Sequence, residues 1–140
     1  MSYTIRVRVI ESRPTAWYSV VEKCNWLYGG YWTEVDGEHF LHMDASGTSG
    51  MLRFRNPAGE FFLVALGVHN YKRWCDIVVD QKNTNTGVEI LPTYYNNGSR
   101  QEMLWKQLAT YEKKTSKGET IKVNYYKEDG NNLYATITIT

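Results

Sequence analysis

Two stretches of the chain together contain short polar side chains and glycines beside aromatic rings and one carboxylate. Residues 45–50 read Ala-Ser-Gly-Thr-Ser-Gly, and residues 67–79 read Gly-Val-His-Asn-Tyr-Lys-Arg-Trp-Cys-Asp-Ile-Val-Val. Amide and carboxylate groups hydrogen-bond the hydroxyls of a sugar, and an aromatic face can cover its apolar C–H side. Glycine lets backbone N–H groups approach a ligand closely. These stretches therefore favour a site for a neutral, hydroxyl-rich ligand.

Catalytic and metal-binding patterns find little support in the same residues. The sequence has no Gly-x-Ser-x-Gly elbow and no Walker loop. His39 and His42 are three residues apart, which on a strand points them to opposite faces, and no cysteine or carboxylate motif completes a zinc site. Cys75, beside Asp76 and near His69, could mimic a thiol nucleophile, but its apolar neighbours favour an inert, buried thiol. We therefore expect no enzymatic activity, no metal and no cofactor.

The charge and the hydropathy of the chain argue against a nucleic-acid-binding or membrane-spanning protein, and its length indicates one domain. At 140 residues the chain is expected to form a single domain over residues 1–140, large enough for a sizeable core. Its 16 basic and 15 acidic residues give a formal charge of +1, which argues against an electrostatic nucleic-acid binder. No apolar run approaches the length of a membrane span.

The start of the chain and the cysteines indicate a cytoplasmic location. Residues 1–9 alternate polar and apolar side chains and lack the apolar core of a secretory signal. Cys24 and Cys75 lie far apart in the sequence. In a reducing compartment we expect both to be free, buried thiols rather than a disulfide.

Most of the secondary structure that must position the two polar stretches is predicted to be β-strand. Tyr3, Ile5, Val7 and Val9 alternate with polar residues, which is typical of a half-buried strand. Further strands are predicted at residues 51–55, 61–68, 74–79, 121–126 and 133–139. The last two flank a Gly/Asp/Asn loop and read as a hairpin, whereas the continuous apolar run 61–66 indicates a strand covered on both faces.

A short helical insertion is expected near residues 99–112. Ser99 as N-cap and Glu102 at the third helical position form a capping box. The apolar face of this helix would consist of Leu104, Leu108 and Tyr111. Many short strands with one inserted helix predict a mainly β protein, an antiparallel β-sandwich.

The chain resembles the fungal fruit-body lectin family, the group of the mushroom T-antigen-binding lectin. The matching segments are 46–50, Leu52-Arg53-Phe54, 67–78, Tyr94-Tyr95, Arg100, Gln107-Leu108, Tyr111 and 128–135. The match keeps one register over the whole chain. It implies a β-sandwich related to the actinoporins, assembly as a homotetramer, and two sugar sites per subunit. One site would take Gal-β(1→3)-GalNAc and the other terminal GlcNAc.

The resemblance also assigns residues to both sites. The galactose-type site would comprise Tyr28, Gly29, Ser46, Gly47, His69, Asn70 and Tyr71. The GlcNAc-type site would comprise Asp76, Ile77, Val78, Val79, Arg100 and Tyr111. At the GlcNAc-type site, backbone groups around Ile77 and Val78 could hydrogen-bond the acetamide group of GlcNAc, and the side chains of these two residues could pack against the acetamide methyl. The chain departs from the family pattern at Gly29-Gly30 and Asp44-Ala45, beside the first site, and at Val79, where threonine is common, in the second.

The leading hypothesis is thus a non-enzymatic, multivalent lectin whose partners are glycans and glycoproteins. The alternative is an actinoporin-like, membrane-damaging protein, which would share the sandwich. Pore formation needs an amphipathic segment that can leave the body and enter the bilayer. Because residues 1–9 alternate as a strand, we expect no membrane insertion. A third reading, a cryptic enzyme, lacks a nucleophile–base pattern.

Overall fold

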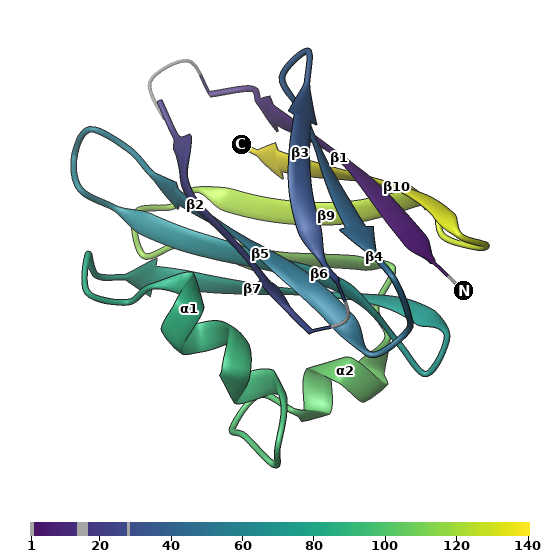
Figure 1. Ribbon diagram of the computed structural model, residues 1–140. Helices are drawn as coiled ribbons and strands as arrows, with labels where there is room; N and C mark the ends of the chain where they lie inside the picture. The colour runs from purple at the N-terminus through teal and green to yellow at the C-terminus, as the bar shows by residue number, and fades with distance from the viewer. Residues whose placement is uncertain (1, 14–16, 28) are drawn as a thin grey trace.

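Two β-sheets packed face to face make up most of the computed structural model, which describes residues 2–13, 17–27 and 29–140. A segment of short helices covers the outer face of the smaller sheet (Figure 1). The mainly β sandwich expected from the sequence is therefore confirmed.

The larger sheet has six strands in the order β3-β4-β1-β10-β9-β8. Their bounds are β3 Tyr31–Val35, β4 Glu38–Met43, β1 Tyr3–Glu11, β10 Asn132–Ile139, β9 Thr120–Lys127 and β8 Thr110–Lys114. Strands β9 and β10 form the predicted antiparallel hairpin. The central pair β1 and β10 is instead parallel, so two strands far apart in the sequence lie side by side in an otherwise antiparallel sheet.

The smaller sheet has four antiparallel strands in the order β2-β5-β6-β7. Their bounds are β2 Ser19–Trp26, β5 Thr48–Arg55, β6 Phe61–His69 and β7 Lys72–Gln81. Because neighbouring strands run in opposite directions, one end of the sheet holds the end of β2, the start of β5, the end of β6 and the start of β7. The loops that join these ends are consequently brought together in space.

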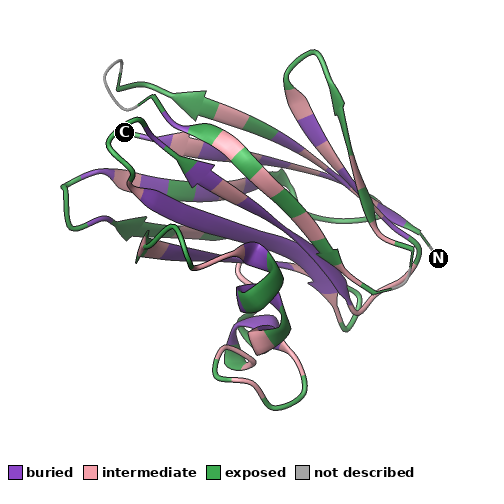
Figure 2. Ribbon diagram, turned by 60° about the vertical axis from the view of Figure 1, so that its left-hand side comes forward, coloured by how far each residue is buried: buried purple, intermediate pink, exposed green. Residues whose placement is uncertain are grey.

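The core lies on both faces of β6, as the apolar run predicted. Phe62, Val64 and Leu66 face the larger sheet, whereas Leu63 and Ala65 face the helical segment. All are fully buried, and Figure 2 shows the buried positions concentrated in the strands at the centre of the molecule. Each large apolar side chain buried in this way contributes roughly 1.5–3 kcal/mol to stability. The four-stranded sheet is therefore a rigid frame for the loops at its edges.

The helical segment differs from the helix expected near residues 99–112. It consists of α1 (Gly87–Ile90), the 3₁₀ turn η1 (Leu91–Tyr94) and α2 (Glu102–Lys106). The capping box is wrong, because α2 begins after Gln101, whose side chain makes no capping hydrogen bond. The helix ends where Gln107 adopts a left-handed φ of 47°. Tyr111 then lies on strand β8, because pairing with β9 replaces a further helical turn.

The described residues include no helix long and apolar enough to cross a membrane.

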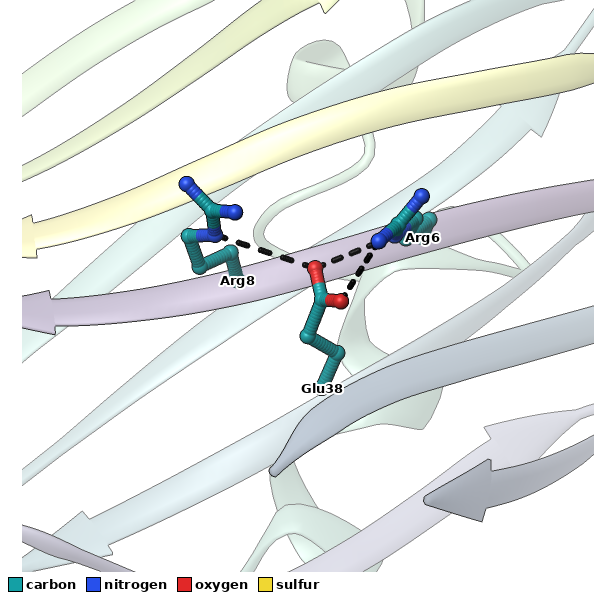
Figure 3. Close-up of polar contacts among 3 residues, drawn as sticks. All are labelled: Arg6, Arg8 and Glu38. Atoms are coloured by element: carbon teal, nitrogen blue, oxygen red, sulfur yellow. Dashed lines mark hydrogen bonds and ion pairs between the residues drawn. The ribbon is translucent and has the colours of Figure 1, made fainter. Parts of the chain in front are cut away.

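The outer face of the larger sheet carries a charged cluster that ties β1 to β4. The Arg6 guanidinium donates to both oxygens of Glu38, with Nε–Oε1 at 3.0 Å and Nη2–Oε2 at 2.6 Å (Figure 3). Arg8 lies on the other side of the same carboxylate, with Nε 3.7 Å from Oε1. The hydrogen bond from Arg6 lowers the pKa of Glu38. A bidentate pair of this kind fixes geometry more than stability at an exposed surface, and here it fixes the register of β1 against β4.

Candidate functional site

A groove of about 350 Å³ opens at the end of the smaller sheet where β5 begins and β6 ends. Its lining consists of Ser46, Gly47, His69, Asn70, Tyr71 and Trp105. Five of these six residues belong to the galactose-type site expected from the sequence. The structure therefore brings together residues from the β4–β5 loop and the β6–β7 turn that are more than twenty positions apart in the chain.

The turn between β6 and β7 presents Asn70 and Tyr71 to solvent. His69 pairs with Lys72, so these two residues are the whole connection, and both have positive φ, 49° and 65°. Two positive φ angles match the type I′ turn that suits the twist of a hairpin, and asparagine tolerates this conformation better than most residues. The Tyr71 ring is 76 % exposed. The sequence thus places an amide and an aromatic face side by side at a tight turn.

Two hydrogen bonds hold the β4–β5 loop against this turn. The backbone N–H of Tyr71 donates to Ser46 Oγ at 2.9 Å, and the backbone N–H of Gly47 donates to the Val68 carbonyl at 2.8 Å. Gly47 has a φ of 89°, which favours glycine. Because Ser46 Oγ accepts from the backbone, its own O–H remains available as a donor.

His69 and Trp105 also line the groove. Their rings meet edge to face with centroids 4.5 Å apart, and the indole is 57 % exposed. Both His69 ring nitrogens are buried and have no hydrogen-bond partner within the described residues, and burial lowers the pKa of this imidazole. Gln107 Nε2 donates to the His69 carbonyl at 2.8 Å, which ties the end of α2 to β6. Sequence reasoning missed Trp105, because only the placement of α2 brings it to the groove.

Gly29 lies near the groove without lining it. Its φ is 61°, and a side chain at this position would overlap the carboxylate of Asp44, two residues before Ser46. The β2–β3 connection therefore packs directly against the β4–β5 loop. Tyr28, the other residue assigned to this wall, lies outside the described residues.

A second cluster surrounds Asp76 in the middle of β7. The Asp76 side chain lies on the face of β7 that the helical segment covers, and the residue is only 5 % exposed. The Tyr94 hydroxyl, from η1, donates to Asp76 Oδ2 at 2.6 Å. Burial raises the pKa of Asp76, while this hydrogen bond and the backbone N–H of Ile77 lower it. Tyr94 was noted in the sequence only as part of an aromatic pair, since its distance from Asp76 in the chain hides the contact.

Arg100 and Tyr111 approach the same carboxylate from two other elements. The positive charges of Lys113 and, to a smaller extent, Arg100 lower the pKa of Asp76, and the Asp76 charge adds to burial in raising the pKa of Tyr111. Arg100 Nη1 donates to Thr93 Oγ1 at 3.0 Å, which anchors the loop before α2. Asp76, Arg100 and Tyr111 therefore lie close enough for their charges to influence one another.

The neighbours of Asp76 along β7 divide between the two faces of the strand. Val78 lies on the same face as Asp76, but Ile77 is fully buried in the core between the sheets, and Val79 packs against that core. The expectation that the Ile77 side chain packs a ligand methyl is therefore wrong, because strand residues alternate between faces. Ile77 can offer a ligand only its backbone groups.

The cysteines and the other two histidines lie outside these clusters. Cys24 and Cys75 are both free, as expected, but only Cys75 is buried in the core, whereas Cys24 is partly exposed. Burial raises the pKa of both thiols to about 12, so neither is an activated nucleophile. His39 points into the sandwich, whereas His42 faces outward and bonds Thr33.

Comparison with known proteins identifies the family. The model of the family described as "Fungal fruit body lectin" matches residues 1–137. The chain belongs to this family. It is therefore a carbohydrate-binding lectin, as the resemblance implied.

Individual members of the lectin family are similar over their whole length. Boletus edulis lectin is 46 % identical over 140 residues, which cover 98 % of each chain. The crystal structure of the wild-type Xerocomus chrysenteron lectin superposes with a TM-score of 0.97 at 45 % identity and covers all of both chains. The lipid binding protein Nakanori gives a TM-score of 0.64 at 13 % identity, covering 99 % of this chain and 71 % of its own, and this likeness extends to the fold alone.

Proposed function

We propose that the protein is a cytoplasmic, non-catalytic lectin that binds glycans and glycoproteins at two sites per subunit. The groove around Asn70 takes Gal-β(1→3)-GalNAc, and the cluster around Asp76 takes terminal GlcNAc. The observation that carries the proposal is the groove itself, whose lining combines two exposed aromatic residues, Tyr71 and Trp105, with Ser46 and Asn70. The free thiols support the cytoplasmic location, because secreted proteins tend to oxidise theirs.

The chemistry of the groove suits a galactose-type sugar. Asn70 offers both a donor and an acceptor, and Ser46 offers a hydroxyl already held in place by the Tyr71 backbone. The axial hydroxyl of galactose also donates and accepts, while the apolar side of its ring fits against an aromatic face. Tyr71 and Trp105, which both line the groove, provide such faces.

The chemistry at Asp76 suits an acetamido sugar. The carboxylate is held by Tyr94 and can accept from a sugar hydroxyl, while Arg100 supplies donors nearby. Val78 lies on the same face and offers an apolar contact for the acetamide methyl. Because Tyr94 holds one oxygen of the carboxylate in place, a ligand would meet a preformed hydrogen-bond acceptor.

The galactose-type site is tested by removing the Asn70 side chain. Asn70→Gly keeps a residue that accepts positive φ, so the turn is preserved while the amide is lost. Calorimetry should show Gal-β(1→3)-GalNAc affinity reduced about tenfold or more, since an unpaired polar group costs about 1–3 kcal/mol. Binding of GlcNAc should not change. Asn96→Gly is the matched control, because Asn96 also has positive φ but does not line the groove. Unchanged disaccharide affinity in Asn70→Gly would remove Asn70 from the site.

The GlcNAc-type site is tested by Asp76→Asn. The amide oxygen can still accept from Tyr94, so the fold is kept while the charge is lost. Hydrogen bonds to a charged group contribute about 1.5–3 kcal/mol, which is enough to reduce a weak monosaccharide affinity below detection. Disaccharide binding should be retained. GlcNAc binding equal to that of the native protein would exclude Asp76 as a ligand-binding residue.

The proposal includes a homotetramer. A single shallow sugar site binds weakly, so recognition of a cell surface depends on several sites acting together. The expected result of light scattering at micromolar concentration is four subunits, together with agglutination of cells that display the disaccharide. A stable monomer would contradict this part of the proposal.

A further inference from the structure

A second pocket lies next to the Asn70 groove, at the open end of the sandwich between the two sheets. Its volume is about 210 Å³. Residues 71–73 of the β6–β7 hairpin form one wall and residues 128–130 of the β9–β10 turn form the other, with Tyr3 and Leu133 between them. None of these residues except Tyr71 belongs to either proposed sugar site.

Tyr71 connects the two cavities, because it lines both. Its backbone is fixed by the hydrogen bond to Ser46, and its ring is largely exposed. A ligand in the groove that stacks on this ring is therefore adjacent to the second pocket. A chain of sugars could run from one cavity to the other past the same aromatic side chain.

The polar groups of the pocket are balanced in charge. Arg73 Nη2 and Glu128 Oε1 form an ion pair at 3.1 Å, with the arginine side chain 15 % exposed and the glutamate 49 % exposed. Lys72 and Asp129 add one charge of each sign, and among the described residues their side chains make no hydrogen bond or ion pair. Two cations and two carboxylates leave no net charge to attract an ionic ligand. They do offer donors and acceptors at close spacing, which suits neighbouring hydroxyls.

The size of the pocket limits the occupant to one sugar ring. Sites for drug-sized ligands enclose roughly 300–1,000 Å³, and this pocket is smaller. Combined with the balanced charge, this favours a single neutral monosaccharide unit over an anionic substituent or a peptide.

We propose that this pocket is a subsite for one further neutral sugar of the glycan whose disaccharide occupies the Asn70 groove. The proposal rests on the proposed galactose-type function of that groove. It makes the protein selective for the sugar attached to the disaccharide as well as for the disaccharide itself, with Asp129 and Lys72 binding the additional hydroxyls.

The test compares ligands of different length by calorimetry. The probes are Gal-β(1→3)-GalNAc, neutral trisaccharides that extend it by one galactose at either end, and a trisaccharide extended by sialic acid. The native protein should bind at least one neutral trisaccharide about tenfold more tightly than the disaccharide, a gain of about 1.4 kcal/mol. Native protein that binds the disaccharide but gains nothing from extension, or gains only with sialic acid, would overturn the subsite alone. Protein that binds none of the probes would refute the proposed function and the subsite with it.

A double variant tests whether the gain in trisaccharide affinity comes from this pocket. Lys72→Gln with Asp129→Asn removes both unpaired charges but keeps the ion pair of Arg73. The trisaccharide should lose most of its advantage, while the disaccharide affinity stays unchanged. Glu112→Gln with Lys122→Gln is the matched control, since this exposed pair lies on β8 and β9 away from both cavities. A trisaccharide advantage that survives in the Lys72/Asp129 variant would place the additional sugar elsewhere.

Discussion

The hydrogen bond between Tyr94 and Asp76 offers a stringent test of how the second cluster is built. Tyr94→Phe removes one hydroxyl from a fully buried ring and leaves the packing against Trp74 in place. The Asp76 carboxylate then loses its side-chain donor in an environment that water scarcely reaches. We expect the variant to fold but to be clearly less stable than the native protein.

The magnitude follows from the charge of the acceptor. A hydrogen bond to a charged group contributes about 1.5–3 kcal/mol, whereas one between neutral groups contributes about 0.5–1.5 kcal/mol. Tyr94→Phe should therefore cost about 2–3 kcal/mol in the native background but only about 1 kcal/mol in Asp76→Asn. For a chain of this size the larger loss lowers the Tm by roughly 6–12 °C. The difference between the two backgrounds, about 1–2 kcal/mol, is the coupling between the hydroxyl and the charge.

The pH dependence gives an independent check with a defined sign. Burial raises the pKa of Asp76 above the ordinary 3.8, and the Tyr94 hydroxyl opposes this increase, so Tyr94→Phe raises that pKa further. A raised carboxyl pKa contributes stability that is complete below 3.8 and is lost as the pH rises through the native pKa. The cost of Tyr94→Phe should thus be largest at neutral pH and shrink as Asp76 becomes protonated.

The assay is urea denaturation of the four proteins of the double-mutant cycle at about pH 7 and near the ordinary carboxyl pKa of 3.8. Equal costs of Tyr94→Phe in the native and Asp76→Asn backgrounds, or a cost that grows at low pH, would refute the reasoning. Either result would mean that Asp76 is neutral or otherwise satisfied in the native protein.

Two further predictions concern packing and thiol reactivity. Gly67→Ala should lower the free energy of unfolding by about 1–3 kcal/mol, because the new Cβ would lie 2.6 Å from the Thr48 carbonyl oxygen and from Ser49 Cβ, and 2.8 Å from Nε1 of the fully buried Trp74. In the control Gly30→Ala the nearest atom is 3.2 Å away on a side chain that can move, so urea denaturation should show a smaller change. Cys24 and Cys75, whose pKa values burial raises to about 12, should react slowly with a disulfide reagent at about pH 8 and rapidly in denaturant. Rapid labelling of the native protein, followed by absorbance, would show that the thiols are accessible.

Local patterns predicted six of the ten strands among the described residues, namely β1, β5, β6, β7, β9 and β10. They missed β2, β3, β4 and β8, and of these β2, β3 and β8 contain no fully buried residue that would mark a core-facing side. Tyr3 to Val9 alternate because successive side chains of a strand point to opposite faces of the sheet. Residues 61–66 are continuously apolar because β6 is buried on both faces. The helix expected near residues 99–112 is present but shorter, at Glu102–Lys106. Residues 110–114 pair with β9, and this non-local pairing overrides a helical spacing that looks favourable in isolation.

In the candidate groove, too, only part of the lining could be predicted from the sequence. The turn that presents Asn70 was predictable, because asparagine after an apolar strand is typical of a tight turn. Trp105 was not, since it reaches the groove only through the contact of its ring with His69. Residues supplied by the chain's own turns can be read from sequence, while those supplied by packing of a distant element cannot.

The parallel pairing of β1 with β10 has a consequence for how the protein is made. Thr4 lies opposite Asn132, and Glu11 opposite Ile139, so strands from opposite ends of the sequence are joined at the centre of the larger sheet. During synthesis the inner edge of β1 has no partner until β10 leaves the ribosome. An unpaired edge of this kind can pair with another chain, and closing so long a loop is slow. The nascent protein is therefore exposed to aggregation until β10 emerges and completes the centre of the larger sheet.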